Sequence, residues 1–377
     1  MQLLPASRRR IKVIRVLWIM LWWGLVGALE AWSTQALFSS TFVEPAAHFD
    51  AWRYFWVNTL TWSVAGLVAG FALTFYLRER LRTRSFGMAI LVNSLVLTVI
   101  NFSISGLAFT YFLKLKNESF NLLAPWENPA ALLARPYYLR TLILLYIVSL
   151  ITVILINVID KYGRGGFAKM LLGYYYRPRE EERIFMFVDI KSSTAIAEKL
   201  GHIRFFDLLN DFFRDITNSI IYSYGEIYQY VGDEIVISWT MKNGLPKGRC
   251  VQCFYAMQEA INKRSERYQE KYDLVPEFKA GLHCGLVTTG EIGVIKKDIV
   301  YSGDVLNTTH RIQTLCNQYG VKILLSKYLL DQLQLPPSDF DAFRVGNIEL
   351  KGKRQKVELY TFDHDLEVEG VRGGEFN

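Results

Sequence analysis

The chain has 377 residues, of which 51% are hydrophobic, and its formal net charge is +7. The length exceeds that of one average domain and the hydrophobic fraction exceeds that of most soluble proteins, so we expect membrane-spanning segments beside at least one folded domain. Because the positive charge is unevenly spread along the chain, we expect no nucleic-acid partner.

Four apolar segments precede residue 161, and each is long enough to cross a bilayer, which takes about 20 helical residues. These segments are Val16–Val43, which is interrupted only by Glu30, then Tyr54–Leu77, Ser85–Leu113 and Thr141–Ile159. A signal peptide is the alternative for the first segment, but no small-residue cleavage site follows it and three more spans do. We therefore predict an α-helical membrane domain with four transmembrane helices over residues 1–160, embedded in a lipid bilayer.

Basic residues mark one side of this domain. They precede the first span and fill the connection between the second and third spans: Arg8, Arg9, Arg10, Lys12, Arg15, Arg78, Arg80, Arg82 and Arg84. Since positive residues stay on the cytoplasmic side, we expect a multi-pass protein of the plasma (bacterial inner) membrane with both termini in the cytoplasm.

Glu30 is the ionisable residue inside a predicted span. Such residues are costly to bury and are often functional, so one hypothesis is a ligand- or proton-sensing role. The alternative is that Glu30 lies near the outer interface or pairs with a neighbouring helix. A transporter is disfavoured because the loops are short and no inverted repeat is visible. The ligand or partner of the membrane domain stays unknown.

A juxtamembrane linker is predicted over residues 161–182. It begins with three glycines within 163–166, which end the last span. The apolar and aromatic segment 168–176 then predicts a short helix at the membrane surface, or an element that couples the last span to the following domain.

The following domain opens on a strand that ends in a carboxylate. Residues 184–188 are nearly all apolar, Asp189 follows them, and the next helix runs to Leu200. The helix is preceded by residues that favour its N-cap, namely Ser192, Ser193 and Thr194. A carboxylate beside a helix N-terminus suits a metal-bound polyphosphate. Taken alone, however, a strand, an acid and a cap are common in α/β proteins.

The later elements place a second carboxylate beside the first. A long amphipathic helix is predicted over 203–224, a β-hairpin over 226–239 with Asp233 at its turn, a helix over 245–272 and a strand over 278–287. This order, βαββαβ, is that of a ferredoxin-like α+β sheet. In that topology the first strand and the hairpin are neighbours, so Asp189 and Asp233 would lie side by side, where they can share Mg²⁺ or Mn²⁺. The alternative is that Asp233 is present only because aspartate after glycine favours this turn, and that it binds no metal.

Two later stretches carry groups that suit a nucleotide. Asn307 and Arg311 are four residues apart, hence on one face of a predicted helix, where an amide and a guanidinium can bind ribose and phosphate charge. Lys351 and Lys353 flank a glycine turn that suits phosphate oxygens, or that is a solvated basic turn. The Cys250-x-x-Cys253 pair has no second pair with matching spacing, so ordinary reduced thiols are expected there instead of a zinc or redox site.

In this order and spacing the stretches resemble a class III adenylyl/guanylyl cyclase catalytic domain. The resemblance covers 183–362, from which we predict a catalytic domain over 183–365 and a C-terminal tail over 366–377. The matching motifs are Phe-Val-Asp-Ile-Lys-Ser-Ser-Thr (187–194), Val-Gly-Asp-Glu (231–234), Gly-Leu-His-Cys-Gly (281–285), Gly-Asp-Val-Leu-Asn-Thr-Thr-His-Arg (303–311) and Leu-Lys-Gly-Lys (350–353).

The resemblance implies roles for these residues. Two ions, Mg²⁺ or Mn²⁺, would be held by Asp189, Asp233 and the main-chain carbonyl of Ile190. Residues 190–194 would hold the triphosphate.

It implies further roles outside the metal site. Asn307 would orient the ribose, Arg311 would stabilise the transition state and Lys351 would bind the terminal phosphates. Because family members share each site between two paired domains and this chain carries both sets of residues, a homodimer with two equivalent sites is implied.

The positions for base recognition depart from the family pattern. They hold Gln229 and Val300, where adenylyl cyclases commonly have Lys with Asp or Thr, and guanylyl cyclases Glu with Cys. ATP is favoured because neither guanine-type residue is present, which predicts formation of cyclic AMP and pyrophosphate. The alternatives are a guanylate cyclase and a catalytically silent nucleotide-binding receptor. A diguanylate cyclase is disfavoured because Val231 precedes Gly232 where that family has a second glycine.

Overall fold

The computed structural model divides the chain into two compact units, Leu4–Lys161 (the helical unit) and Tyr162–Asn377 (the C-terminal unit). The structure describes residues 6–39, 51–77, 80, 86–115, 136–162, 172–295, 297–333, 341–349 and 356–362. Lys351, the tail 366–377 and the glycines of 163–166 lie outside these ranges, so the predictions made for them are not addressed by the structure.

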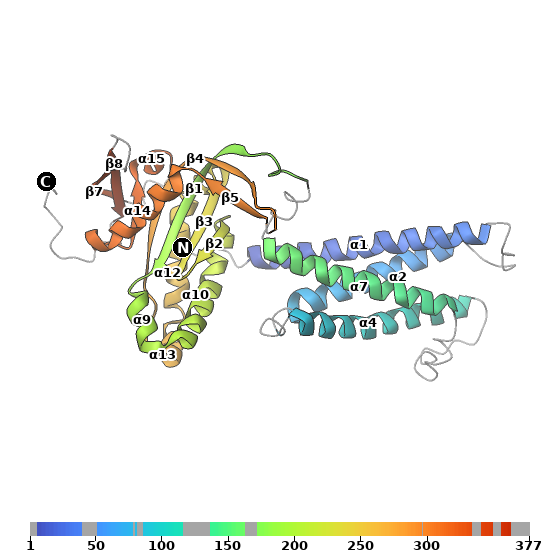
Figure 1. The fold of residues 1–377 in the computed structure, drawn as a ribbon. Helices are drawn as coiled ribbons and strands as arrows, with labels where there is room; N and C mark the ends of the chain where they lie inside the picture. Colours follow the sequence, from blue (N-terminus) through green and yellow to red (C-terminus); the bar gives the residue numbers. More distant parts are fainter. Residues whose placement is uncertain are drawn as a thin grey trace. The chain divides into compact units, whose positions relative to one another are not determined.

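The helical unit is built from four long helices (Figure 1). They are α1 (Ala6–Ser39), α2 (Ala51–Phe71), α4 (Phe86–Leu115) and α7 (Pro136–Tyr162), and α2 continues into a π-helical turn, η1 (Ala72–Leu77). Within the described residues, four helices are long and apolar enough to cross a membrane. Large hydrophobic side chains such as Trp18, Leu91 and Ile143 are exposed along them, which is the distribution expected for helices that face lipid.

Glycines allow α1 and α2 to approach closely. A Cβ placed on Gly27 would lie 2.5 Å from Cβ of Trp62, and one placed on Gly66 would lie 2.7 Å from Cβ of Trp23. Each tryptophan therefore packs over a glycine of the other helix, as small residues permit in membrane helix pairs.

The C-terminal unit contains a single large sheet with helices. The strands are β1 (Arg179–Ile190), β2 (Glu226–Val231), β3 (Glu234–Thr240), β4 (Phe278–Ile292), β5 (Asp298–Ser302), β6 (Ile323–Ser326), β7 (Ala342–Glu349) and β8 (Lys356–Phe362). The helices are α9 (Ser193–Leu200), α10 (His202–Tyr222), α11 (Met241–Gly244), α12 (Arg249–Asn262), α13 (Ser265–Tyr272), α14 (Asp304–Tyr319) and α15 (Lys327–Leu330). The strand order is β2-β3-β1-β4-β6-β8-β7, with β5 paired to β4. The ferredoxin-like βαββαβ sheet predicted from the sequence is thus confirmed, and strands β5 to β8 extend it.

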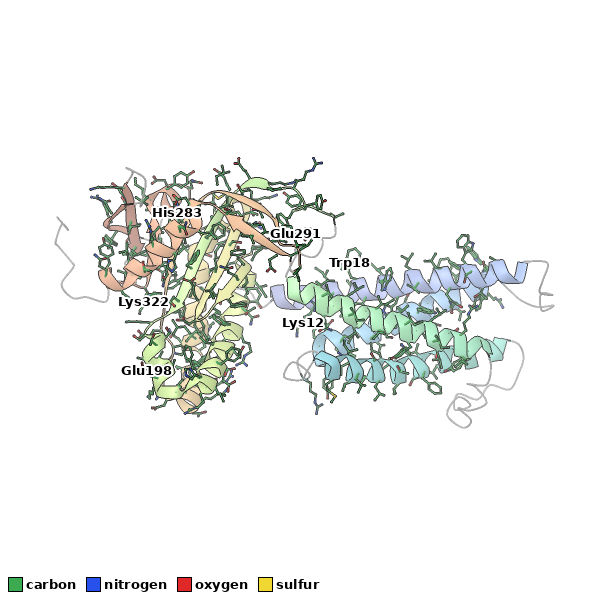
Figure 2. All side chains as sticks on the ribbon, in the orientation of Figure 1. Lys12, Trp18, Glu198, His283, Glu291 and Lys322 are labelled. Atoms are coloured by element: carbon green, nitrogen blue, oxygen red, sulfur yellow. The ribbon has the colours of Figure 1, made fainter. Side chains whose placement is uncertain are left out.

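Both faces of the central strand β1 are covered. Ile184, Met186 and Val188 point into a core formed with α10 and α12, whereas Phe185 and Phe187 point into a second cluster on the opposite face. Side chains fill the space between the sheet and these helices (Figure 2). Burial on both faces explains why the strand is a continuous apolar run in place of an alternating one.

Three local predictions are corrected. The helix expected over 245–272 is two helices, α12 and α13, separated at Lys263 and Arg264, within a polar run that has no apolar side chain to pack in the core. The strand expected over 278–287 continues to Ile292 because β5 pairs with its extension. The described part of the predicted surface helix, 172–176, is a turn and bend instead, since it runs beside β4, where the Glu291 N–H donates to the Tyr175 carbonyl (3.0 Å).

Candidate active site

The ends of β1 and of the β2–β3 hairpin bring two carboxylates together. β1 and β3 pair antiparallel with Val188 opposite Ile235, so Asp189 at the end of β1 lies beside the hairpin turn that carries Asp233. Gly232 makes this tight turn possible because its φ of 62° is in the left-handed region. The juxtaposition expected from the topology is therefore present in a single chain.

The pair of Asp189 and Asp233 has little positive charge beside it. Burial, together with the adjacent Asp233, raises the pKa of Asp189 to about 6. Burial and the charges of both aspartates raise the pKa of Glu234 to about 7. The cation beside Asp189 is Lys279, whose Nζ lies 3.4 Å from Oδ2. Several carboxyl groups around one ammonium group leave a local excess of negative charge.

One oxygen of this pair lacks a hydrogen-bond donor. Oδ2 of Asp233 is buried and has no hydrogen-bond partner among the described residues. A buried carboxylate oxygen without a donor is costly, and a bound cation would remove that cost. In the described part of the chain no group of three or more His, Cys, Asp or Glu side chains could hold a metal, so a cation here would need main-chain or substrate oxygens as further ligands. Ile190, the residue proposed for such a carbonyl, ends β1 with its side chain buried.

The helix after β1 begins differently from the prediction. α9 starts at Ser193, and Ser192 at its N-cap has a left-handed φ of 57° and makes no side-chain capping bond. The expectation of a serine side-chain cap is wrong at Ser192, since capping residues normally have extended φ and ψ. Ser193 and Thr194 form the first turn of the helix, where main-chain N–H groups are unpaired within any helix.

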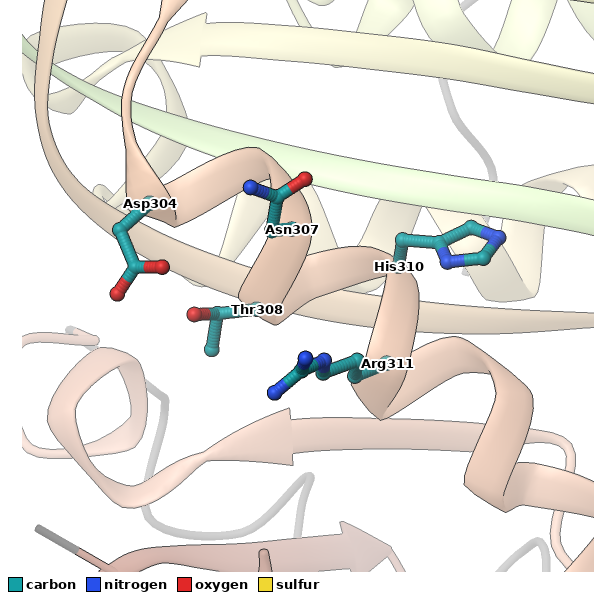
Figure 3. Close-up of a pocket in the computed structure, with 5 residues that line it drawn as sticks. All are labelled: Asp304, Asn307, Thr308, His310 and Arg311. Atoms are coloured by element: carbon teal, nitrogen blue, oxygen red, sulfur yellow. The ribbon is translucent and has the colours of Figure 1, made fainter. Parts of the chain in front are cut away.

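Asn307 and Arg311 lie on one face of α14, as their spacing predicts. Together with Asp304, Thr308 and His310 they line a hollow of about 210 Å³ (Figure 3). Asn307 is exposed and Arg311 is half-buried.

A different face of α14 contacts the pair of Asp189 and Asp233 at Asp189. Gln313, which is 2% exposed, donates a hydrogen bond from Nε2 to Oδ2 of Asp189 (3.2 Å). Two residues correspond to about 200° around a helix, so Arg311 points to the side of α14 opposite to Gln313 and Asp189. One chain therefore does not bring Arg311 to its own acid pair.

Gln229 and Val300 lie on different strands of the sheet. Gln229 is exposed on β2, directly after a bulge, and Val300 is half-buried on β5. Strands β3, β1 and β4 separate β2 from β5 in the order of the sheet. The adjacent residues Tyr228 and Tyr301 are in edge-to-face contact, with ring centroids 4.8 Å apart and an interplanar angle of 67°.

Three residues at the site were missed by the sequence analysis: Lys279, Gln313 and Glu234. Lys279 faces Asp189 through the pairing of β1 with β4, and only the strand register reveals it. Gln313 follows Arg311 by two positions, but its role depends on the close approach of α14 to Gly281, where a Cβ would lie 2.3 Å from the Gln313 nitrogen. Glu234 had a visible signal, since it directly follows Asp233.

The four cysteines are free and buried. Burial raises the pKa of Cys253 and of Cys284 to about 12, which keeps these thiols protonated and unreactive.

Glu30 of the helical unit is buried and fully surrounded by donors. Its carboxylate accepts hydrogen bonds from Asn58 (2.6 Å), Tyr54 (3.2 Å) and Thr34 (3.2 Å), and it forms an ion pair with Arg140. The residue thus pairs with neighbouring helices and connects α1 with α2 and α7.

The comparisons with known proteins agree with the fold and the motifs. Residues 175–364 match the family model of the adenylate and guanylate cyclase catalytic domain. The chain belongs to this family.

The related sequences include adenylate cyclases and retinal guanylyl cyclases. The chain is 35% identical over 209 residues to adenylate cyclase 2 of Rhizobium meliloti, covering 55% of this chain and 57% of that protein. It is 27% identical over 180 residues to an adenylate cyclase of Anabaena cylindrica, covering 46% of this chain and 35% of that protein. The chain thus spans about half the length of the first of these relatives and a third of the second.

A solved structure shows the same fold. The structure of a bacterial light-regulated adenylyl cyclase superimposes with a TM-score of 0.52 at 20% identity, covering 62% of this chain and 68% of that one.

Proposed function

We propose that the protein is a membrane-anchored adenylate cyclase that converts ATP to 3′,5′-cyclic AMP and pyrophosphate. The observation that carries this proposal is the half-buried pair Asp189 and Asp233, with a buried oxygen of Asp233 that has no hydrogen-bond partner among the described residues. Membership of the cyclase family and the identity to a Rhizobium adenylate cyclase support it.

The donor set fits divalent cations that prefer oxygen. Asp189, Asp233 and the carbonyl of Ile190 would hold two Mg²⁺ or Mn²⁺ ions, since hard carboxylate and carbonyl oxygens are their preferred ligands. When bound, these ions supply activation of the ribose 3′-oxygen and neutralisation of the departing pyrophosphate.

The residues of the chain position the nucleotide. Asn307 hydrogen-bonds the ribose and Arg311 stabilises the charge that develops on the α-phosphate, while the N–H groups at the start of α9 and Lys351 bind the triphosphate. The 3′-hydroxyl loses its proton to solvent and its oxygen attacks the α-phosphorus in line. The new bond closes the cyclic diester, and the bond from the α-phosphorus to the bridging oxygen breaks to release pyrophosphate. The reaction is intramolecular, so positioning and electrostatics account for most of the acceleration.

The helix geometry of α14 supports a homodimer. Gln313 contacts Asp189 of its own chain, so Arg311 and Asn307 point away from that acid pair. A second copy would present its Asn307 and Arg311 to this acid pair, and the arrangement would repeat by twofold symmetry to give two equivalent sites.

ATP is the proposed substrate because neither Gln229 nor Val300 is a residue typical of guanine recognition. Gln can donate and accept, so it suits either adenine or guanine edges. Guanylate cyclase activity is therefore the second candidate, and a silent nucleotide-binding receptor is the third.

Membrane anchorage is supported by the four apolar helices. The basic residues in the first turns of α1 favour a plasma membrane location, in bacteria the inner membrane, with the N-terminus and catalytic domain in the cytoplasm. The satisfied network around Glu30 favours a structural role for that residue over direct ligand sensing.

Turnover by the full-length protein tests the proposal. Product formation from ATP and from GTP should be compared with Mg²⁺ and Mn²⁺, using Asp233→Asn as the inactive variant. Asp207→Asn, the same change at an exposed acid of α10, is the matched control. Preferential conversion of GTP would overturn the choice of substrate, and no cyclic product from either nucleotide would favour the silent receptor.

A further inference from the structure

Exposed apolar and aromatic side chains gather where the linker joins the C-terminal unit. Val294 and Ile295, at the turn between β4 and β5, are fully exposed, and Leu172 and Tyr176 of the linker are exposed by 82% and 77%. We call the whole set the hairpin patch: Leu172, Tyr174, Tyr176, Ile292, Val294 and Ile295.

The two halves of the hairpin patch lie beside each other. β1 pairs antiparallel with β4 up to Arg179 and Thr289, and the linker continues the same path. The Glu291 N–H donates to the Tyr175 carbonyl (3.0 Å), and a Cβ on Gly290 would lie 3.4 Å from Cα of Pro178. Residues 172–176 therefore run along the end of β4 toward the hairpin turn. Glu291 is labelled on this hairpin in Figure 2.

Two aromatic residues of the linker, Tyr174 and Tyr176, face outward. Tyr175 is 5% exposed, whereas its neighbours Tyr174 and Tyr176 are exposed. The Arg179 guanidinium lies over the Tyr174 ring at 4.4 Å. An ordered patch of exposed apolar side chains marks an interaction site more often than it marks ordinary surface.

The short connection between α7 and the hairpin patch limits which partners the patch can contact. The last helix of the helical unit, α7, ends at Tyr162, and the ten residues from 163 to 172 span at most about 36 Å when fully extended. Since α7 is a candidate membrane span, this connection limits the distance of Leu172 from the end of that span to about 36 Å.

The chemistry of the patch suits that surface. Three exposed cations belong to the same segments, Arg177 and Arg179 on the linker and Lys297 on the hairpin, and Nζ of Lys297 lies 3.5 Å from Oε1 of Glu291. Aliphatic side chains with tyrosines and cations beside them are typical of segments that bind the interface of an anionic bilayer.

We propose that the hairpin patch binds the surface of the membrane in which the chain is anchored, with Val294 and Ile295 among the lipid headgroups. The inference rests on the proposed membrane anchorage and does not depend on the cyclase reaction. It has a consequence for the site, because β5 leads through Gly303 directly into α14, which carries Asn307 and Arg311. Lipid contact would therefore fix the strand that precedes these residues.

Site-specific labelling of the full-length protein tests the proposal. Val294→Cys is labelled with an environment-sensitive fluorophore, and because the native cysteines are buried the label should be selective. The protein is placed in nanodiscs of phosphatidylcholine and phosphatidylglycerol that contain a spin-labelled lipid. The control is Glu266→Cys, an exposed position on α13, which lies away from the hairpin in Figure 1.

We expect the spin-labelled lipid to quench the label at 294 several-fold more than the label at 266. A label at Lys297→Cys should be quenched too, and Val294→Asp with Ile295→Asp should abolish that quenching without unfolding, since both side chains are solvent-exposed.

Equal quenching at 294 and 266 would overturn the proposal. So would efficient disulfide formation between Val294→Cys copies together with weak quenching, which would show that a second copy of this chain covers the patch. Alkaline extraction of membranes separately reports whether the helices are anchored, and no readout here requires nucleotide turnover.

Discussion

Acidic side chains have different surroundings in the two units. In the helical unit, Glu30 is surrounded by a cation and by amide and hydroxyl donors from three helices. In the C-terminal unit, Asp189 faces another carboxylate, and Asp233 has a buried oxygen without a donor among the described residues. A buried carboxylate that has its cation and donors, such as Glu30, connects the helices that supply them. Two adjacent carboxylates without enough donors are unfavourable until a cation binds. The contrast supports the proposal that Glu30 has a structural role and that the two aspartates hold cations.

The largest expected effect is that of Asp189→Asn. Activity should fall by on the order of 10³ or more, because a metal-binding group is lost, while thermal stability should be unchanged or higher, because repulsion with Asp233 is removed. Cyclic AMP production and calorimetry of the same preparations provide the two measurements. A marked loss of stability would mean that Asp189 is a structural acid like Glu30.

The reverse pattern is expected for Arg140→Ala. The change leaves the Glu30 carboxylate, whose side chain is 4% exposed, without its cation, so the helical unit should lose about 3 kcal/mol of stability. Unfolding of the protein in lipid micelles by a denaturing detergent measures this loss. The double variant Glu30→Gln with Arg140→Ala should be more stable than Arg140→Ala alone. A double variant that is equally unstable would contradict the pairing.

Substitution of closely packed glycines should have smaller effects on stability, and these effects should again differ between the two units. Gly281→Ala would place a Cβ 2.3 Å from the main-chain nitrogen of Gln313, which cannot move alone. We expect a loss of about 2 kcal/mol and lower activity, because α14 carries Arg311. Gly66→Ala meets the Trp23 side chain at 2.7 Å and should destabilise the helical unit only. Gly87→Ala, with open space around it, is the neutral control, and melting curves with turnover assays measure all three.

The smallest expected effect concerns pH. Burial alone would raise the pKa of Asp211, but hydrogen bonds from Lys271 and Tyr272 and the charge of Arg214 outweigh it and lower the pKa below the ordinary value. The contribution of Asp211 is therefore complete above its unfolded pKa, about 4, and is lost as the pH falls through the lower folded value.

This acid sensitivity has a direct test. Asp211→Asn should lower stability at neutral pH by about 1.5 kcal/mol, the value of a hydrogen bond to a charged group, and the gap to the wild type should close as the pH falls below 4. Calorimetry between pH 7 and pH 3 measures the gap. A gap that stays constant with pH would show that the carboxylate charge is not what joins α10 to α13.

Much of the site was predictable because it depends on chain order. The strand before Asp189, the turn at Asp233 and the spacing of Asn307 and Arg311 are local patterns, and the ferredoxin-like topology makes the two aspartates neighbours. The family motifs added the expected roles.

What could not be predicted depends on register and on long-range packing. Lys279 reaches Asp189 only through the pairing of β1 with β4, and Arg140 reaches Glu30 from 110 positions away. The left-handed φ of Ser192 was also missed, since serine at that position normally signals an extended cap.

Complementation between two defective copies tests the central claim most directly. Asp189→Asn lacks one half of the proposed site and Arg311→Ala lacks the other, so each alone should be nearly inactive. Coexpressed, they should regain about a quarter of the wild-type cyclic AMP formation, because half of randomly paired dimers are mixed and each mixed dimer has one intact site of two. Activity no greater than that of the separate variants would contradict a cyclase whose sites are shared between two chains.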